Sequence, residues 1–275
     1  MLREFFEIYC QNGGKITSLN QYLKENQKGA VVLLGGFILD FLEKIPSLVK
    51  QESVFLLSPL NFNPASNIKQ FLYEVGCEEL VLALLAESLL QDEVVKNQTF
   101  IQDLDIGYLA SEINLAEEEI FEIQQSFKKN SKNALIIGED IFTHKNAKNI
   151  AKILALFSQN HTLEVVFLEE QMVSIMPHFE EITKVEEVGD FDGLVAYLHY
   201  DDSIKSPILK ASRQFGLVGK VSDKERVEVV FEDSEVLEVE FYENKEIKGM
   251  VGILLLPTKE DSSFCYQKIR LNKIM

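Results

Sequence analysis

The side chains best suited to move a proton or hold a metal ion near neutral pH are histidines. The chain has four of them, at His144, His161, His178 and His199. No two are three to five residues apart, so the spacing by which a helix presents a pair of zinc ligands is absent. We therefore predict no metal site, and we expect each histidine to be solvated or hydrogen-bonded.

The three cysteines, Cys10, Cys77 and Cys265, are far apart in the sequence and odd in number. This spacing predicts neither a disulfide framework nor a thiolate metal site. An iron–sulfur cluster held by four local cysteines is excluded by their number. We expect free thiols, buried as cysteine usually is.

A glycine pair, Gly35 and Gly36, directly follows a short apolar run that is typical of a buried strand. The third glycine of a dinucleotide-binding fingerprint is missing, which favours a tight turn from strand to helix. The alternative is a phosphate-binding loop, completed by Ser58 and Asn61 after the next apolar run. On that interpretation the chain binds a nucleotide or a pterin through these four residues.

Two adjacent acids, Glu139 and Asp140, follow Gly138 at the end of another apolar run. Open α/β sheets bind ligands at the carboxyl ends of their strands, so this pair is placed for acid–base chemistry or for a cation. Turns before helices favour the same residues for structural reasons, and we weigh that interpretation more heavily. A hydrolase that uses Glu139 and Asp140 is a third hypothesis.

Three lysines, Lys145, Lys148 and Lys152, are spaced by three and four residues, which places them on one face of a helix. One interpretation is an ordinary solvated face. The other is a docking stripe for an acidic partner, because this is the one compact basic stripe in an acidic chain.

These residues lie in a region where apolar runs alternate with helical patterns. We expect strands at residues 30–34, 54–57, 134–137 and 163–168. We expect helices at residues 37–49 with a break near Pro46, from 63–67 onward, and at 77–90, 114–129 and 146–157. This alternation predicts an α/β domain over residues 1–200, built on a mostly parallel sheet with helices on both faces.

After about residue 200 the apolar residues recur at every second position, as in Val227, Val229 and Phe231. Further strands are expected at residues 235–243, 249–256 and 264–271. We predict that residues 201–275 form a small antiparallel β domain with one face open to water, joined to the first domain at residues 201–207.

The composition limits the partners. Lysine and arginine total 27 against 44 aspartate and glutamate residues, which gives a net charge of −17. Such a charge argues against binding to nucleic acid, and it keeps a protein soluble or steers it to a basic partner. No apolar run approaches the length of a membrane-spanning helix, and the acidic N-terminus is unlike a secretory signal. We expect a cytoplasmic protein without direct membrane insertion.

The segment Ala134-Leu-Ile-Ile-Gly-Glu-Asp, with the helical stretch that follows it to Phe157, resembles the large Fe–S subunit of bacterial NADH:quinone oxidoreductase, respiratory complex I. The resemblance lies in that subunit's molybdopterin-oxidoreductase-like region. Residues 221–231, 239–249 and 251–257 are similar to the small β domain that ends this superfamily, although Lys224 replaces the expected glycine. The matching positions of the first segment are Gly138, Glu139, Asp140, His144, Ala147, Asn149, Ile150 and Ala151.

The resemblance implies the scaffold half of this subunit, because the cysteine-rich cluster-binding domains of the family have no counterpart here. It implies no cofactor and no catalytic residue of its own. The expected role is that of an accessory or variant subunit in the peripheral arm of the complex. It would contact other subunits, and it would reach the inner face of the cell membrane only through them.

Overall fold

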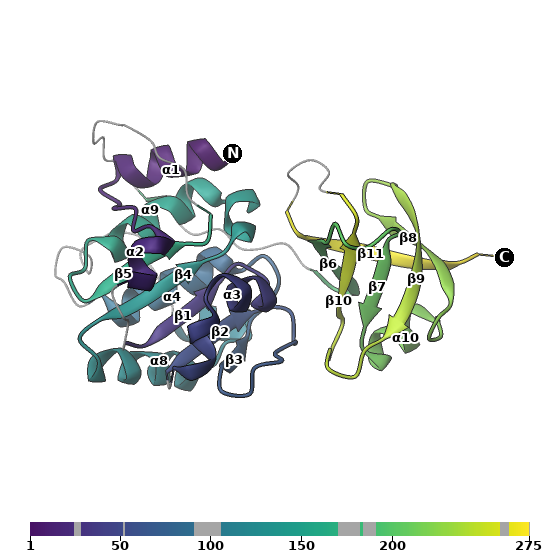
Figure 1. Cartoon of the computed structure of the whole chain (residues 1–275), viewed down its shortest axis with the longest axis horizontal. Helices are drawn as coiled ribbons and strands as arrows, with labels where there is room; N and C mark the ends of the chain where they lie inside the picture. The colour runs from purple at the N-terminus through teal and green to yellow at the C-terminus, as the bar shows by residue number, and fades with distance from the viewer. Residues whose placement is uncertain are drawn as a thin grey trace. The chain divides into compact units, whose positions relative to one another are not determined.

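The computed structural model describes residues 1–24, 29–51, 53–90, 106–169, 182–183, 191–258 and 264–274. The chain divides into two compact units (Figure 1). The first unit consists of Met1–Ser58 and Ala65–Val188, and the second of Pro59–Pro64 and Gly189–Met275. No helix within the described residues is long and apolar enough to cross a membrane.

The first unit is built on a five-stranded sheet in which every strand pair is parallel. The strand order is β3-β2-β1-β4-β5. The strands are β1 (Val31–Leu34), β2 (Val54–Ser58), β3 (Lys69–Leu72), β4 (Asn133–Ile137) and β5 (Leu163–Phe167). The parallel sheet predicted from the alternating pattern is confirmed.

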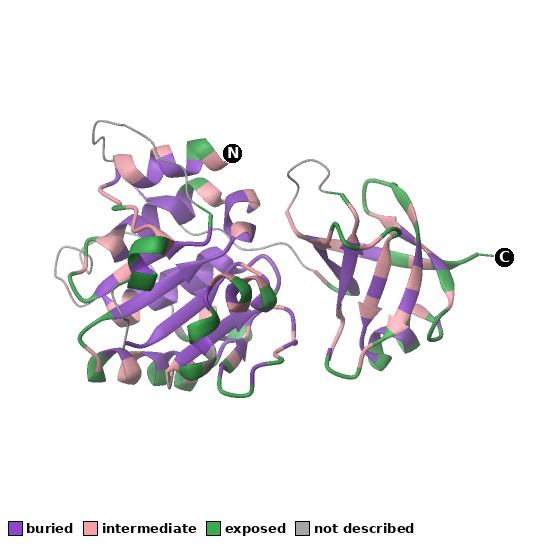
Figure 2. Cartoon of the chain, viewed as in Figure 1, coloured by how far each residue is buried: buried purple, intermediate pink, exposed green. Residues whose placement is uncertain are grey.

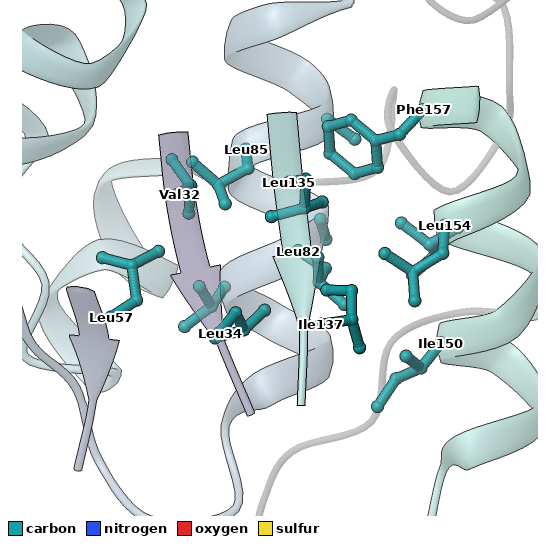
Figure 3. Packing of buried hydrophobic residues seen from close by; sticks show 14 of the residues in the cluster. Val32, Leu34, Leu57, Leu82, Leu85, Leu135, Ile137, Ile150, Leu154 and Phe157 are labelled. Atoms are coloured by element: carbon teal, nitrogen blue, oxygen red, sulfur yellow. The ribbon is translucent and has the colours of Figure 1, made fainter. Parts of the chain in front are cut away.

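Helices cover both faces of this sheet. They are α1 (Leu2–Gln11), α2 (Leu19–Lys24), α3 (Ile38–Lys44), α4 (Glu78–Leu89), α7 (Ile106–Glu112), α8 (Glu117–Lys129) and α9 (Ala147–Ser158), with 3-10 turns η1 (Pro46–Lys50) and η2 (Glu139–Thr143). Val32 and Leu34 pack with residues of α4 and α9, whereas Val31 and Leu33 are buried outside that cluster. Successive residues of a strand point to opposite faces, so both faces are buried (Figure 2). Figure 3 shows Val32 and Leu34 in the cluster that they form with residues of α4 and α9.

An aromatic cluster fixes α1 against α9, η2 and β5. The Phe5 ring lies edge-on to Phe142, with 5.0 Å between the ring centroids, and the Phe6 ring lies edge-on to Phe167 at 4.9 Å. Aromatic pairs in this geometry contribute beyond the apolar area that they bury. This packing brings the start of the chain beside the start of α9.

Two predictions for the first unit are wrong in detail. Residues 63–67 do not begin a helix, because the chain continues into the edge strand β3. Proline occurs in turns as readily as in the first turn of a helix, so Pro64 did not distinguish the two. The helix expected from Asn114 begins at Glu117, and its Glu119 carboxylate accepts a hydrogen bond from the Ala116 backbone N–H at 3.0 Å.

The second unit is a closed six-stranded barrel with the order β10-β6-β11-β8-β9-β7. A short helix, α10 (Arg213–Gly219), follows β7 and packs Phe215 into the barrel core with Phe241. The strands are β6 (Leu194–Tyr200), β7 (Ile208–Ala211), β8 (Arg226–Phe231), β9 (Val236–Glu243), β10 (Val251–Leu256) and β11 (Tyr266–Lys273). A small β domain after the α/β domain is thus confirmed.

The barrel corrects two details of that prediction. Strand pairs β6–β10 and β7–β9 are parallel, so the domain is mixed, and its apolar face is enclosed by the barrel. Alternation of apolar residues reveals a half-buried strand but not the direction of its neighbour. The boundary expected at residues 200 and 201 is also wrong, because β6 pairs with β10 and β11 inside the second unit.

Candidate functional site

The carboxyl ends of β1 and β4 lie at the point where the strand order reverses, which is where open α/β sheets usually bind ligands. Here backbone groups from the two ends are in contact. Gly138 N–H donates to the Leu34 carbonyl at 2.9 Å, and Asp140 N–H donates to the Gly35 carbonyl at 3.0 Å. A Cβ on Gly138 would lie 2.3 Å from the Gly35 oxygen.

Gly35 and Gly36, which follow β1, therefore allow the carboxyl ends of β1 and β4 to approach each other closely. A Cβ on Gly36 would lie 3.0 Å from the Gly138 Cα, and the buried Ile141 side chain fills the space beside Gly35. Gly35 also has φ +67°, a conformation that glycine adopts without strain. These contacts favour the tight turn and leave no space for a phosphate between Gly36 and Gly138.

The other two residues of the alternative ligand site, Ser58 and Asn61, are grouped with different units. Ser58 ends β2 beside β1 and is buried. Asn61 belongs to the segment grouped with the second unit, where its carbonyl accepts a hydrogen bond from the Lys248 N–H at 3.0 Å. Gly35, Gly36 and Ser58 thus lie at neighbouring strand ends of the first unit.

Of the two acids after β4, Glu139 is partly exposed and Asp140 is buried. The Glu139 carboxylate is partly exposed and lies 3.6 Å from the Lys44 ammonium, which also contacts Glu169 at 2.6 Å. Asp140 is buried, and its carbonyl accepts a hydrogen bond from the Thr143 hydroxyl. The hypothesis of a hydrolase based on these two acids gains no support from this arrangement.

The three lysines of the predicted stripe converge on one pocket of about 420 Å³ beside the start of α9. Lys145 and Lys148 are exposed, but Lys152 is 9% exposed, so the prediction of an exposed stripe is wrong at that position. Lys152 lies on α9, which packs against both α1 and α4. The lining also includes Glu4, Phe5, Glu79, Phe142, His144, Asn146, Asn149 and Thr183.

A buried carboxylate forms one wall of this pocket. Glu79, on α4, is 1% exposed, and both of its oxygens accept hydrogen bonds from amides, one from Asn146 at 2.5 Å and the other from Asn149. Asn149 also pairs with the backbone of Thr183 through two hydrogen bonds of 3.0 Å. Burial of a carboxylate requires such hydrogen bonds, so these two asparagines hold Glu79 in place.

A second buried acid, Glu78, faces His144. Glu78 is 1% exposed, its Oε2 lies 3.3 Å from His144 Nε2, and its Oε1 accepts a hydrogen bond from the Tyr73 hydroxyl at 3.2 Å. His144 Nε2 also contacts the Gly76 carbonyl at 2.9 Å, while Nδ1 accepts from the Asn146 N–H. Burial lowers the pKa of His144, but Glu78, the Gly76 carbonyl and Glu79 together outweigh it, so the pKa is raised.

A different hollow, of about 370 Å³, lies between α4 and α8. We call it the acidic groove; it is lined by Leu84, Glu87, Ser88, Glu117, Glu118, Ile120, Phe121 and Gln124. Phe121 is 58% exposed, which is unusual for a phenylalanine. An exposed aromatic ring with carboxylates beside it suits a partner that carries both apolar and basic side chains.

Sequence reasoning missed Glu78 and Glu79. Acids are common in the first turn of a helix because they complement its dipole, so nothing local marks these two as buried. The expectation for His144, a hydrogen-bonded residue, is confirmed. No group of three histidine, cysteine or acidic side chains in the described part of the chain is arranged to hold a metal ion; His178 lies outside that part.

Comparison with known proteins does not identify a family for this chain. No protein-family model matches the chain, and no curated protein matches its sequence.

Proposed function

We propose that this chain is an accessory or variant subunit of a respiratory NADH:quinone-oxidoreductase-type complex, in which it acts as a scaffold in the peripheral arm. The resemblance of residues 134–157 and 221–257 supports this proposal. So does the order of the two units, because an α/β domain followed by a small β domain is the fold that the resemblance implies.

The observation that carries the scaffold role is the contact between the carboxyl ends of β1 and β4. In an open α/β sheet this position is where a cofactor is usually bound. Here Gly36 and Gly138 approach each other directly, and Ile141 fills the adjacent space. A chain whose usual cofactor position is occupied by its own backbone can still act through its surface.

The acidic groove is the surface best suited to that role. Glu117 and Glu118 are exposed beside Phe121, and the whole chain carries a net charge of −17. Charge of one sign steers a protein toward a partner of opposite sign. We therefore assign the groove to a lysine- or arginine-rich segment of a partner subunit that also supplies an apolar side chain for the contact with Phe121.

Affinity capture tests the proposal. The tagged chain is expressed in its own cells, membranes are solubilised in mild detergent, and the captured proteins are identified by mass spectrometry. We expect subunits of a respiratory oxidoreductase complex to be recovered together with the chain. Recovery of the chain without any of them would contradict the proposal.

A ligand screen distinguishes the scaffold from the alternative nucleotide- or pterin-binding protein. The purified chain is heated with a panel of nucleotides, flavins and pterins, and its unfolding temperature is recorded. A stabilised chain that captures no respiratory subunit would favour the alternative. The alternative also predicts that substitution of Ser58 abolishes the stabilisation, since Ser58 lies at the strand ends beside Gly35.

A further inference from the structure

The pocket beside the start of α9 shares no lining residue with the acidic groove. It is also distinct from the carboxyl ends of β1 and β4, where Gly36 and Gly138 are in contact. Its walls come from α1, from the N-terminal end of α4, and from the connection between η2 and α9. A volume of about 420 Å³ lies in the range of small-molecule sites, which combine apolar walls with a few convergent polar groups.

Three of the nine polar side chains that line this pocket are lysines. Lys145, Lys148 and Lys152 all line it, in a chain whose net charge is −17. Lys152 is 9% exposed, a degree of burial that is rare for lysine. Concentration of positive charge in this way suits an anion, because lysine binds phosphate as a point charge.

The acids in the pocket already have partners. The Glu4 carboxylate contacts the Lys148 ammonium at 2.6 Å, and that contact lowers the pKa of Glu4. Glu79 accepts hydrogen bonds from the amides of Asn146 and Asn149. The lining thus holds three lysines against two glutamates, an excess of one positive charge.

The start of α9 adds to the positive field. Asn146, its N-cap residue, makes no side-chain cap hydrogen bond to the helix, because its amide is directed to Glu79. The Ala147 N–H already donates to the His144 carbonyl at 3.0 Å, so the helix dipole is the contribution of this end that favours an anion. The rings of Phe5 and Phe142 form the apolar part of the lining.

We infer that this pocket binds a small phosphorylated organic molecule. The phosphate would lie among Lys145, Lys148 and Lys152 at the start of α9, and the organic part would contact Phe5 and Phe142. The inference does not depend on membership in a respiratory complex, since a scaffold subunit can also bind a small ligand.

Isothermal titration calorimetry on the full chain tests this assignment with two probes, phenyl phosphate and inorganic phosphate. We expect phenyl phosphate to bind more tightly than inorganic phosphate because it also contacts the phenylalanine walls. We expect Lys152→Gln to weaken phenyl phosphate binding at least tenfold, equivalent to about 1.4 kcal/mol. Lys128→Gln, which removes the same charge from the exposed end of α8, is the matched control and should leave the affinity unchanged.

Lys145→Gln combined with Lys148→Gln repeats the test at exposed positions, so the assignment stays falsifiable if Lys152→Gln fails to fold. We expect this double variant to weaken binding at least tenfold as well. Three results would overturn the assignment: no binding of phenyl phosphate at millimolar concentration, equal affinity for the two probes, or lysine variants that bind as tightly as the control. None of these results would affect the capture of respiratory subunits.

Discussion

Two adjacent residues at the start of α4, Glu78 and Glu79, place carboxylates inside the first unit. Each depends on groups that come from distant parts of the sequence, Glu78 on His144 and Glu79 on Asn146 and Asn149. Removal of one partner from a buried polar pair leaves the other without compensation, which usually costs more than the pair contributes. These contacts therefore tie α4 to the start of α9.

The Glu78–His144 pair predicts a pH dependence of stability. The pKa of His144 is raised in the folded chain above its ordinary value of 6.5, because Glu78 favours the protonated ring. The stabilisation is therefore fully present below about pH 6.5 and is lost as the pH rises through the folded pKa. Urea unfolding between weakly acidic and weakly alkaline pH measures this loss.

Glu78→Gln is the matched variant for that measurement, because its amide oxygen can still accept the Tyr73 hydrogen bond without a charge. We expect the wild-type free energy of unfolding to fall with increasing pH over this interval, and the fall to be absent or much smaller in Glu78→Gln. Identical pH profiles would show that Glu78 does not act on His144.

Cys77 is predicted to be unreactive in the folded chain, although it caps the N-terminal end of α4. A helix N-terminus alone lowers the pKa of a thiol, but burial raises the pKa of Cys77 to about 12, with a further contribution from Glu78. At pH 8 we expect Cys77 to react with a chromogenic disulfide reagent only after urea unfolding. Cys77→Ser should leave the number of promptly reacting native thiols unchanged, and a decrease by one would refute the prediction.

At the scale of elements, β1 and β4 meet through glycine, and this contact is predicted to be sensitive to a single methyl group. Gly138→Ala should lower the free energy of unfolding by about 1–3 kcal/mol, because the new Cβ overlaps the Gly35 carbonyl. Gly107→Ala, on an exposed position of α7, is the matched control and should stabilise the chain by up to about 1 kcal/mol. If both substitutions changed the free energy of unfolding in urea by the same amount, the ends of β1 and β4 would have to separate easily to accommodate the new methyl group.

The acidic groove between α4 and α8 makes a second prediction at this scale. Phe121→Ser combined with Glu117→Lys and Glu118→Lys should reduce the captured respiratory subunits at least tenfold, because the aromatic contact is removed and the local charge reversed. Leu217→Ser, which replaces another exposed apolar residue, 69% exposed on α10, is the control for a general change in surface polarity. Undiminished capture by the groove variant would place the partner elsewhere.

The sequence was informative wherever an element is buried on both faces or alternates regularly. The apolar runs of β1 and β4, and the helical pattern of α9, correspond to the observed elements within one or two residues. It was uninformative for β3, an edge strand that begins with Lys69 and Gln70 and is only partly buried. The pairing directions of the barrel strands could not be predicted from the sequence either, because the side-chain pattern of one strand does not show which strand pairs with it or in which direction.

The candidate site shows the same limit. The spacing of Lys145, Lys148 and Lys152 predicted that they share a helix face. This is wrong for Lys145, which lies in the turn before α9, but all three lysines line one pocket. The burial of Lys152 could not be predicted, because α9 packs against α1 and α4, two helices that lie far from it in the sequence. Sites assembled from distant segments leave no local signal in either segment.

At the scale of the whole molecule, we propose that this chain works through its surface. It has two folded units, a net charge of −17, and ends of β1 and β4 that are in direct contact. The most direct test is to separate mild-detergent membrane extracts on a native gel and to quantify this chain across the gel by mass spectrometry. We predict that it migrates with the respiratory oxidoreductase complex, in constant ratio to the other subunits. Migration of the chain alone, with the complex intact and free of it, would contradict the account.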